Sequence, residues 1–115
     1  MSRVLGQDGE QVAAAHLKSL GYRIVHRNFT SKFGELDLVA KDPQFGWVYV
    51  EVKSYKPQSF LDPLEAITKS KIKKLLKTVQ YYQLCHRNAE DAARFDVIVV
   101  AGDRVKEHLM GAITL

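Results

Sequence analysis

Two neighbouring segments of this 115-residue chain, residues 34–41 and 47–55, alternate apolar and polar side chains with a period of two. This period is typical of β-strands that bury one face. The residues between them, 42–46, begin with Asp-Pro and end with Gly, which favours a hairpin loop. If Lys41 pairs with Trp47, one face of the hairpin is entirely apolar. On that face the register places Leu36, Leu38 and Ala40 against Val52, Val50 and Val48.

The same register places two carboxylates, those of Asp37 and Glu51, opposite each other. Facing residues have Cβ atoms roughly 4.5–5.5 Å apart, where like charges are destabilising, and a divalent cation between them reverses the sign of that interaction. Lys53 follows on the same face, about 7 Å beyond Glu51. Oxygen ligands suit Mg²⁺ or Mn²⁺, and a cation beside a lysine neutralises charge on a phosphate. The pattern therefore predicts a metal site for phosphodiester hydrolysis.

A simpler interpretation treats the charged residues of the hairpin as ordinary surface ion pairs. In the predicted register Lys53 can pair with Glu35 or with Glu51, and exposed pairs of this kind stabilise a fold by only ~0–1 kcal/mol. A one-residue bulge would also remove the clash between Asp37 and Glu51, because the register depends on an assumed loop length. Both interpretations remain open at the level of the sequence.

The rest of the chain predicts an α/β domain with the order α-β-β-β-α-β-β. A helix over residues 7–20 precedes a strand over 22–29, and a long helix begins at an N-cap Asp62 and ends near His86. Strands follow over residues 95–101 and from 105 to about 108, with an uncertain C-terminal segment. The apolar run at residues 97–101 favours an interior strand reached by a crossover. We expect one domain over residues 1–115, with a mixed central β-sheet and a helix on each face.

The positive charge of the chain, +4 in total, is concentrated between residues 53 and 77. That window holds seven lysines, two acids and no arginine. Such a patch favours a polyanion partner such as nucleic acid, although a solvated lysine-rich helix face would give the same pattern. The candidate nucleic-acid contacts in this window are Lys56, Lys69, Lys71, Lys73, Lys74 and Lys77.

Several other classes of protein are disfavoured. No apolar run approaches the ~20 residues of a membrane span, and the N-terminus lacks the apolar stretch of a signal peptide. With a single cysteine, Cys85, these features predict a cytoplasmic protein without a membrane partner. The histidines have no ligand spacing for zinc, and no Gly-rich loop indicates ATP binding. The aromatic residues Tyr55, Phe60, Tyr81 and Tyr82 could stack on bases, but core packing is the favoured interpretation.

Taken together, these motifs resemble the PD-(D/E)xK nuclease superfamily, and within it the small YraN-like proteins related to Holliday-junction resolvases. The resemblance spans roughly residues 5–113, and Leu36 departs from it where a proline would precede Asp37. It rests on the two hairpin segments, Gly34-Glu35-Leu36-Asp37-Leu38-Val39-Ala40 and Val48-Tyr49-Val50-Glu51-Val52-Lys53, together with Gly6, Gly9-Glu10, Gly21-Tyr22, Arg27-Asn28, Lys71 and Arg94-Phe95-Asp96-Val97.

The resemblance implies a restriction-endonuclease-like nuclease core. In it Asp37 and Glu51 are the metal ligands, Lys53 is the catalytic lysine, and Glu10 is an acidic accessory residue of the first helix. Without the resemblance, the favoured interpretation of Glu10 is a helix-start charge stabilised by the helix dipole. Asp96 stays outside the catalytic set, as a strand-end partner of an arginine, either Arg94 or Arg104.

We therefore expect a Mg²⁺- or Mn²⁺-dependent endonuclease-like protein that acts on DNA, including branched DNA. By analogy with resolvases, which cut two equivalent strands, we also expect a homodimer. Two alternatives remain, a non-catalytic nucleic-acid-binding module of the same fold and an interaction subunit of a larger complex.

Overall fold

A computed structural model describes residues 5–57 and 67–115 of the chain, with side chains from Gly9 onward in the first helix. The elements follow the predicted order α-β-β-β-α-β-β. They are α1 (Leu5–Ser19), β1 (Arg23–Ser31), β2 (Gly34–Asp42), β3 (Gly46–Ser54), α2 (Lys69–His86), β4 (Ala93–Ala101) and β5 (Arg104–Ile113). No helix within the described residues is both long enough and apolar enough to cross a membrane.

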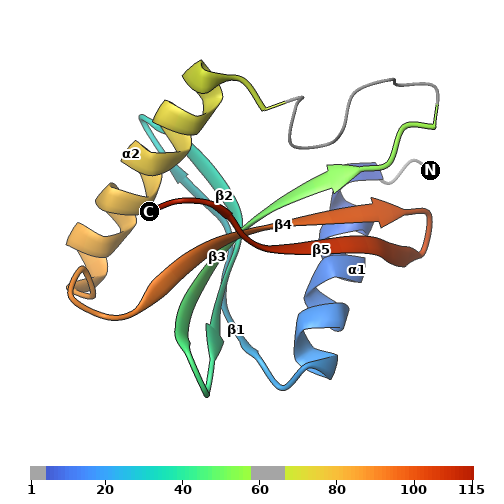
Figure 1. Ribbon diagram of the computed structural model, residues 1–115, viewed down its shortest axis with the longest axis horizontal. Coiled ribbons are helices and arrows are strands. Elements are labelled where there is room, and N and C mark those ends of the chain that lie inside the picture. The colour runs from blue at the N-terminus through green and yellow to red at the C-terminus, as the bar shows by residue number, and fades with distance from the viewer. Residues whose placement is uncertain (1–4, 58–66) are drawn as a thin grey trace.

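The five strands form one mixed sheet with the spatial order β1-β2-β3-β4-β5. Neighbouring strands are antiparallel except β3 and β4, which run parallel and are joined through α2. Figure 1 shows α1 and α2 on opposite sides of this sheet. The predicted interior position of the apolar strand is confirmed, because β4 lies between β3 and β5 and residues 95–100 are all buried.

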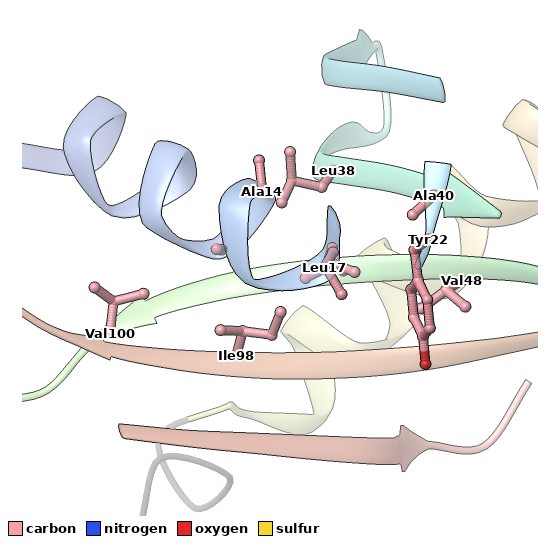
Figure 2. Packing of buried hydrophobic residues seen from close by; sticks show 10 residues of the cluster. Ala14, Leu17, Tyr22, Leu38, Ala40, Val48, Ile98 and Val100 are labelled. Atoms are coloured by element: carbon pink, nitrogen blue, oxygen red, sulfur yellow. The ribbon is translucent and has the colours of Figure 1, made fainter. Parts of the chain in front are cut away.

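Each helix covers one face of the sheet with its apolar side. Ala14 and Leu17 of α1 pack on a first core cluster that includes Leu38, Val48 and Ile98 (Figure 2). On the other face α2 contributes to a second cluster, whose buried members are Leu36, Val39, Tyr49, Val79, Tyr82, Phe95 and Ile113. The predicted arrangement of a central sheet with a helix on each face is therefore confirmed.

The β2–β3 hairpin has the predicted register only near its loop. Lys41 pairs with Trp47, and the ladder continues to Leu38 and Val50, where pairing between the two strands ends. Beyond that point the predicted pairs, including Asp37 with Glu51 and Glu35 with Lys53, are not part of the ladder.

The separation coincides with an irregularity of β2 around Asp37. The side chain of Asp37, not its backbone, bonds to β3, because its Oδ2 accepts a hydrogen bond from Val52 N at 2.7 Å. On the β1 side, Asn28 has a left-handed φ of 54°. Leu36, predicted to share a face with Leu38, lies instead in the cluster under α2, so that prediction was wrong.

Helix α2 starts later than predicted. Its N-cap is Thr68, which has extended backbone angles and whose hydroxyl accepts a hydrogen bond from Lys71 N at 3.2 Å. The predicted continuous helix from Asp62 to His86 is therefore wrong at its beginning, while Asp62, Glu65 and Phe60 lie outside the described residues. Strand β5 also continues past the predicted end near residue 108, to Ile113.

Candidate active site

The separation of β2 from β3 opens a cavity of about 260 Å³ between the sheet and the N-terminal half of α2. Asp37 from β2 and Glu51 from β3 both line this cavity, so the two carboxylates are on the same side of the hairpin. Lys71 and Lys74 line it from α2, and the remaining wall residues are Phe33, Gly34, Glu35, Ile67, Leu75 and Thr78. The cavity therefore brings acids from the sheet and amines from the helix together.

Asp37 is the most perturbed acid of this site. Its pKa is raised from 3.8 to about 7, chiefly by burial and then by the negative charge of Glu51. The hydrogen bond from Val52 N partly offsets the rise in pKa, while Glu10 and Glu35 add to it. The fold thus holds a carboxyl group where ionisation is opposed by its surroundings.

Glu51 and Lys53 form an ion pair along β3, in the part of the strand that no longer pairs with β2. Lys53 Nζ lies 3.3 Å from Glu51 Oε2, and the two side chains are 24% and 19% exposed, respectively. This is one of the two ion pairs that the simpler interpretation of the sequence offered. The pair holds the amine of Lys53 beside the carboxylate of Glu51, which itself lines the cavity.

Glu10 approaches the site from the opposite helix. The pKa of Glu10 is raised because burial outweighs a hydrogen bond from the Asn28 side chain, and Glu35 raises it further. Glu10 also has a side-chain interaction with Asp37, which in turn feels its charge. The structure therefore places all four predicted catalytic residues, Asp37, Glu51, Lys53 and Glu10, in one neighbourhood.

The predicted nucleic-acid contacts separate into two groups. Lys71 and Lys74 belong to the cavity, and the pKa of Lys71 is lowered, first by the positive charge of Lys53 and a hydrogen bond with it. The other four, Lys56, Lys69, Lys73 and Lys77, are exposed and do not line the cavity. Five of these six lysines lie on α2, so a polyanion along the helix could contact both groups, while Lys56 lies in the segment after β3.

The sequence interpretation missed two contributors to the site. Phe33 lines the cavity from the β1–β2 turn, and Asn28 hydrogen-bonds Glu10. Asn28 carries one usable signal, since Asn is enriched at the positive φ that it adopts here. No comparable signal exists for Phe33, whose position depends on packing of the turn against α2.

The expected pairing of Asp96 is confirmed for Arg94, whose Nε lies 3.0 Å from Asp96 Oδ1. Arg104 instead lies beside Asp103, at 4.0 Å. Asp96 is fully buried on the strand next to β3 and does not line the acidic cavity.

The carboxylates of Asp37 and Glu51 suit a hard divalent cation, but they do not form a metal site built entirely from protein ligands. Among the side chains that the structure describes, no three Asp, Glu, His or Cys groups could form such a site. Mg²⁺ does not require one, because it commonly binds one or two carboxylates and keeps waters and phosphate oxygens as its other ligands. The partly buried, mutually repelling carboxylates of Asp37 and Glu51 match that requirement.

Comparison with known proteins identifies relatives along almost the whole chain. The model of Uncharacterised protein family UPF0102 matches residues 9–100, a range that includes all four predicted catalytic residues. A UPF0102 protein of Persephonella marina is 37% identical over 114 residues, covering 99% of this chain and 97% of the relative. Relatives from Caldicellulosiruptor saccharolyticus (41% over 98 residues, 85% and 82% covered) and Thermodesulfovibrio yellowstonii (38% over 113 residues, 97% and 98% covered) are similar. These names state a family and no activity.

Proposed function

This chain belongs to the UPF0102 family, the YraN family expected from its motifs, and we propose that it is a metal-dependent endonuclease that hydrolyses phosphodiester bonds in DNA. The observation that carries the proposal is the position of Asp37. A partly buried carboxyl, its pKa raised to about 7 by burial and by Glu51, lines one cavity with amines from α2. Such perturbed groups in a cavity are typical of catalytic sites.

Each residue of the cavity has a distinct role in this proposal. Asp37 and Glu51 would hold Mg²⁺ or Mn²⁺ through their carboxylate oxygens. The cation, when bound, supplies Lewis-acid polarisation of a phosphoryl oxygen and makes water a better nucleophile at neutral pH. Lys53, which is held beside Glu51, donates to a phosphate oxygen and neutralises charge that develops there.

Other side chains bind and orient the strand. Lys71 and Lys74, on the opposite wall, attract the phosphates that flank the scissile bond. Glu10, an accessory acid, interacts with Asp37 and with Asn28 and so restrains the carboxyl of Asp37. In this role Glu10 positions Asp37 and is not itself a ligand of the metal ion.

Cleavage assays with matched variants test the proposal. Supercoiled, single-stranded and four-way-junction DNA would be incubated with the chain and Mn²⁺, alongside the Asp37→Asn and Glu51→Gln variants. We expect cleavage to fall at least about a hundredfold in both variants, because several kcal/mol of charge stabilisation are lost. Glu107→Gln, which alters an exposed acid of β5, is the matched control and should cleave like the parent chain. Cleavage that survives in either acid variant would come from a contaminant and would contradict the proposal.

A second candidate function is a non-catalytic nucleic-acid-binding module. The observation that favours it is the group of exposed α2 lysines, Lys69, Lys73 and Lys77, which do not line the cavity. Salt-dependent DNA binding without cleavage of any substrate would support the module over the enzyme. The interaction-subunit alternative, the homodimer and the cytoplasmic location stay predictions, and size-exclusion chromatography of the chain alone and with cell extract addresses the first two.

A further inference from the structure

Three aromatic rings continue from the acidic cavity onto the surface of the protein. Phe33 lines the cavity, and its ring centroid lies 5.9 Å from that of Tyr81 on α2. Tyr81 in turn lies 6.2 Å from Phe29 of β1, with the two rings tilted by 35°. We call these residues, Phe29, Phe33 and Tyr81, the aromatic strip. Tyr81 is 37% exposed, so the strip has an open surface and is not only core packing.

The local sequence holds Phe33 in place next to α2. The Ser31 hydroxyl accepts a hydrogen bond from Phe33 N and donates one to Gly34 O, both at 3.1 Å. Gly34 has a φ of 147°, and a Cβ atom there would lie 3.2 Å from Thr78 Oγ1 of α2. The glycine therefore lets the β1–β2 turn approach the helix closely (Figure 1). Phe33 is positioned before any ligand binds, which lowers the entropy cost of binding to it.

Basic side chains accompany the strip. Lys32 Nζ lies 5.3 Å from the centroid of the Phe33 ring, and Lys74 lines the cavity. Lys74, Lys77 and Tyr81 recur at spacings of three and four residues, so they occupy neighbouring positions on one side of α2. The step of seven residues from Lys74 to Tyr81 rises about 10 Å along the helix axis, a distance that one or two nucleotides can span.

Aromatic faces beside lysines, at a cavity that could hold a phosphate, are the combination with which proteins bind single-stranded nucleic acid. We propose that Phe33 and Tyr81 stack on one or two unpaired bases next to the phosphate in the cavity, so that the DNA bound here contains a single-stranded segment. The inference rests on the proposed function for the identity of the strand as DNA, and it deepens that function by naming the substrate class. In a continuous duplex the base faces are hidden in the stack, and the strip would have nothing to contact.

The test measures binding in EDTA, so that it does not depend on cleavage. Fluorescence anisotropy would follow the full chain binding to labelled oligo(dT), to a duplex of equal length, and to an oligomer of abasic sites. The variants are Tyr81→Ala, Phe33→Ala and the conservative Tyr81→Phe. Phe45→Ala is the matched control, because Phe45 is similarly exposed, at 44%, but lies in the β2–β3 loop. Thermal melting would verify that each variant is folded.

We expect Tyr81→Ala and Phe33→Ala to weaken oligo(dT) binding about tenfold each, since stacking on an aromatic side chain contributes that much per base. Binding of the duplex should be unchanged, Tyr81→Phe should retain affinity, and Phe45→Ala should behave like the parent chain. The abasic oligomer, which can stack on neither ring, should bind the parent chain at least as weakly as oligo(dT) binds Tyr81→Ala.

The inference is overturned if Tyr81→Ala and Phe45→Ala weaken binding of oligo(dT) equally. It is also overturned if Tyr81→Ala weakens binding of the duplex and of the abasic oligomer by the same factor as binding of oligo(dT). Failure to bind oligo(dT) at low salt also overturns it. If the parent chain cuts no substrate but Tyr81→Ala selectively loses binding of oligo(dT), the stacking surface is supported and only the proposed hydrolase activity is contradicted.

Discussion

Asp37 and Asp96 lie in the same sheet, yet their surroundings differ in a way that separates a structural acid from a candidate functional one. Asp96 is fully buried, and burial alone would raise its pKa, but hydrogen bonds from His108, Gly111 N and Arg94 outweigh it and lower the pKa. Among the described residues Asp37 accepts one such bond, from Val52 N, and its pKa is raised to about 7. The protein itself satisfies the charge of Asp96, whereas the carboxyl of Asp37 is where we propose that a cation binds.

The two environments are assembled from different parts of the chain. His108 of β5 lies 2.8 Å from Asp96 Oδ2 and 3.0 Å from the ring of His16 in α1, while Arg94 reaches Tyr22 OH at 2.6 Å. This network therefore links β4 and β5 to α1 and to Tyr22, which precedes β1. Around Asp37 the nearby charges are instead carboxylates, from Glu51, Glu10 and Glu35. The mutual repulsion of these carboxylates contributes no stability to the fold.

The largest expected effect is on stability. Asp96→Asn should lower the free energy of unfolding by about 3–5 kcal/mol, because Arg94 and His108 lose a buried charged partner. Asp37→Asn at pH 8 should leave stability unchanged or raise it, since it removes a repelled, partly buried charge. Urea unfolding monitored by circular dichroism measures both values. Glu107→Gln serves as the exposed-acid control, and equal losses in the two Asn variants would remove the distinction between the sites.

The next effect is the pH dependence that Asp37 confers. Its pKa is raised in the folded state, from 3.8 to about 7, so the folded chain keeps a proton that the unfolded chain loses between these values. Its contribution is fully present below about pH 4, and the free energy of unfolding should fall as pH rises towards 7, by at most about 4 kcal/mol.

Asp37→Asn should remove this component, so the difference between parent and variant across that pH range isolates it. If the difference in free energy of unfolding between parent and variant does not depend on pH, the pKa of Asp37 is not raised by folding. The repulsion between Asp37 and Glu51 would then be absent. For Asp96, whose pKa is lowered, the sign is opposite, and its contribution is lost only as pH falls.

Most of the fold could be predicted because it depends on local periodicity. The period-two runs identified β2 and β3, and the apolar run at residues 97–101 identified the interior strand. The start of α2 could not be predicted, since Asp62 and Thr68 are both good N-caps and only packing selects between them. The length of β5 was also missed, because its exposed polar residues hide the strand period.

The candidate site was predicted in composition but not in geometry. Alternation placed Asp37 and Glu51 on one side of the hairpin, where both are found lining the cavity. Their separation from the ladder accompanies the bond from Val52 N to Asp37 and the left-handed φ of Asn28 on β1, and the period-two alternation predicts neither. The contact of Phe33 with Tyr81 joins residues far apart in the chain and required the fold.

Metal binding should sharpen the comparison further. At pH 8, Mn²⁺ or Mg²⁺ at a hundred times its dissociation constant should stabilise the parent chain by about 2.7 kcal/mol, which appears as a higher melting temperature. Asp37→Asn and Glu51→Gln should lose this shift, whereas a folded Asp96→Asn variant should keep it. The shift should also weaken at pH 6, because Asp37 must lose its proton to bind a cation. The absence of any shift in the parent chain at saturating Mn²⁺ would argue against a preformed site.

The smallest expected change in stability concerns Lys71, where the same reasoning applies with the opposite charge. Its pKa is lowered, first by the positive charge of the nearby Lys53, so two amines lie close together as the carboxylates do. Lys71→Ala should change the free energy of unfolding by less than about 0.5 kcal/mol, because the side chain is exposed. It should nevertheless reduce the slope of log affinity for DNA against log salt by about 0.9, the value for one lost phosphate contact.

Lys106→Ala, on β5, is the matched control and should leave the slope unchanged. If the two variants alter the slope equally, Lys71 contributes to DNA binding only through the total positive charge of the protein. A selective effect of Lys71 would mean that its amine contacts a phosphate, which would relieve the repulsion between Lys71 and Lys53.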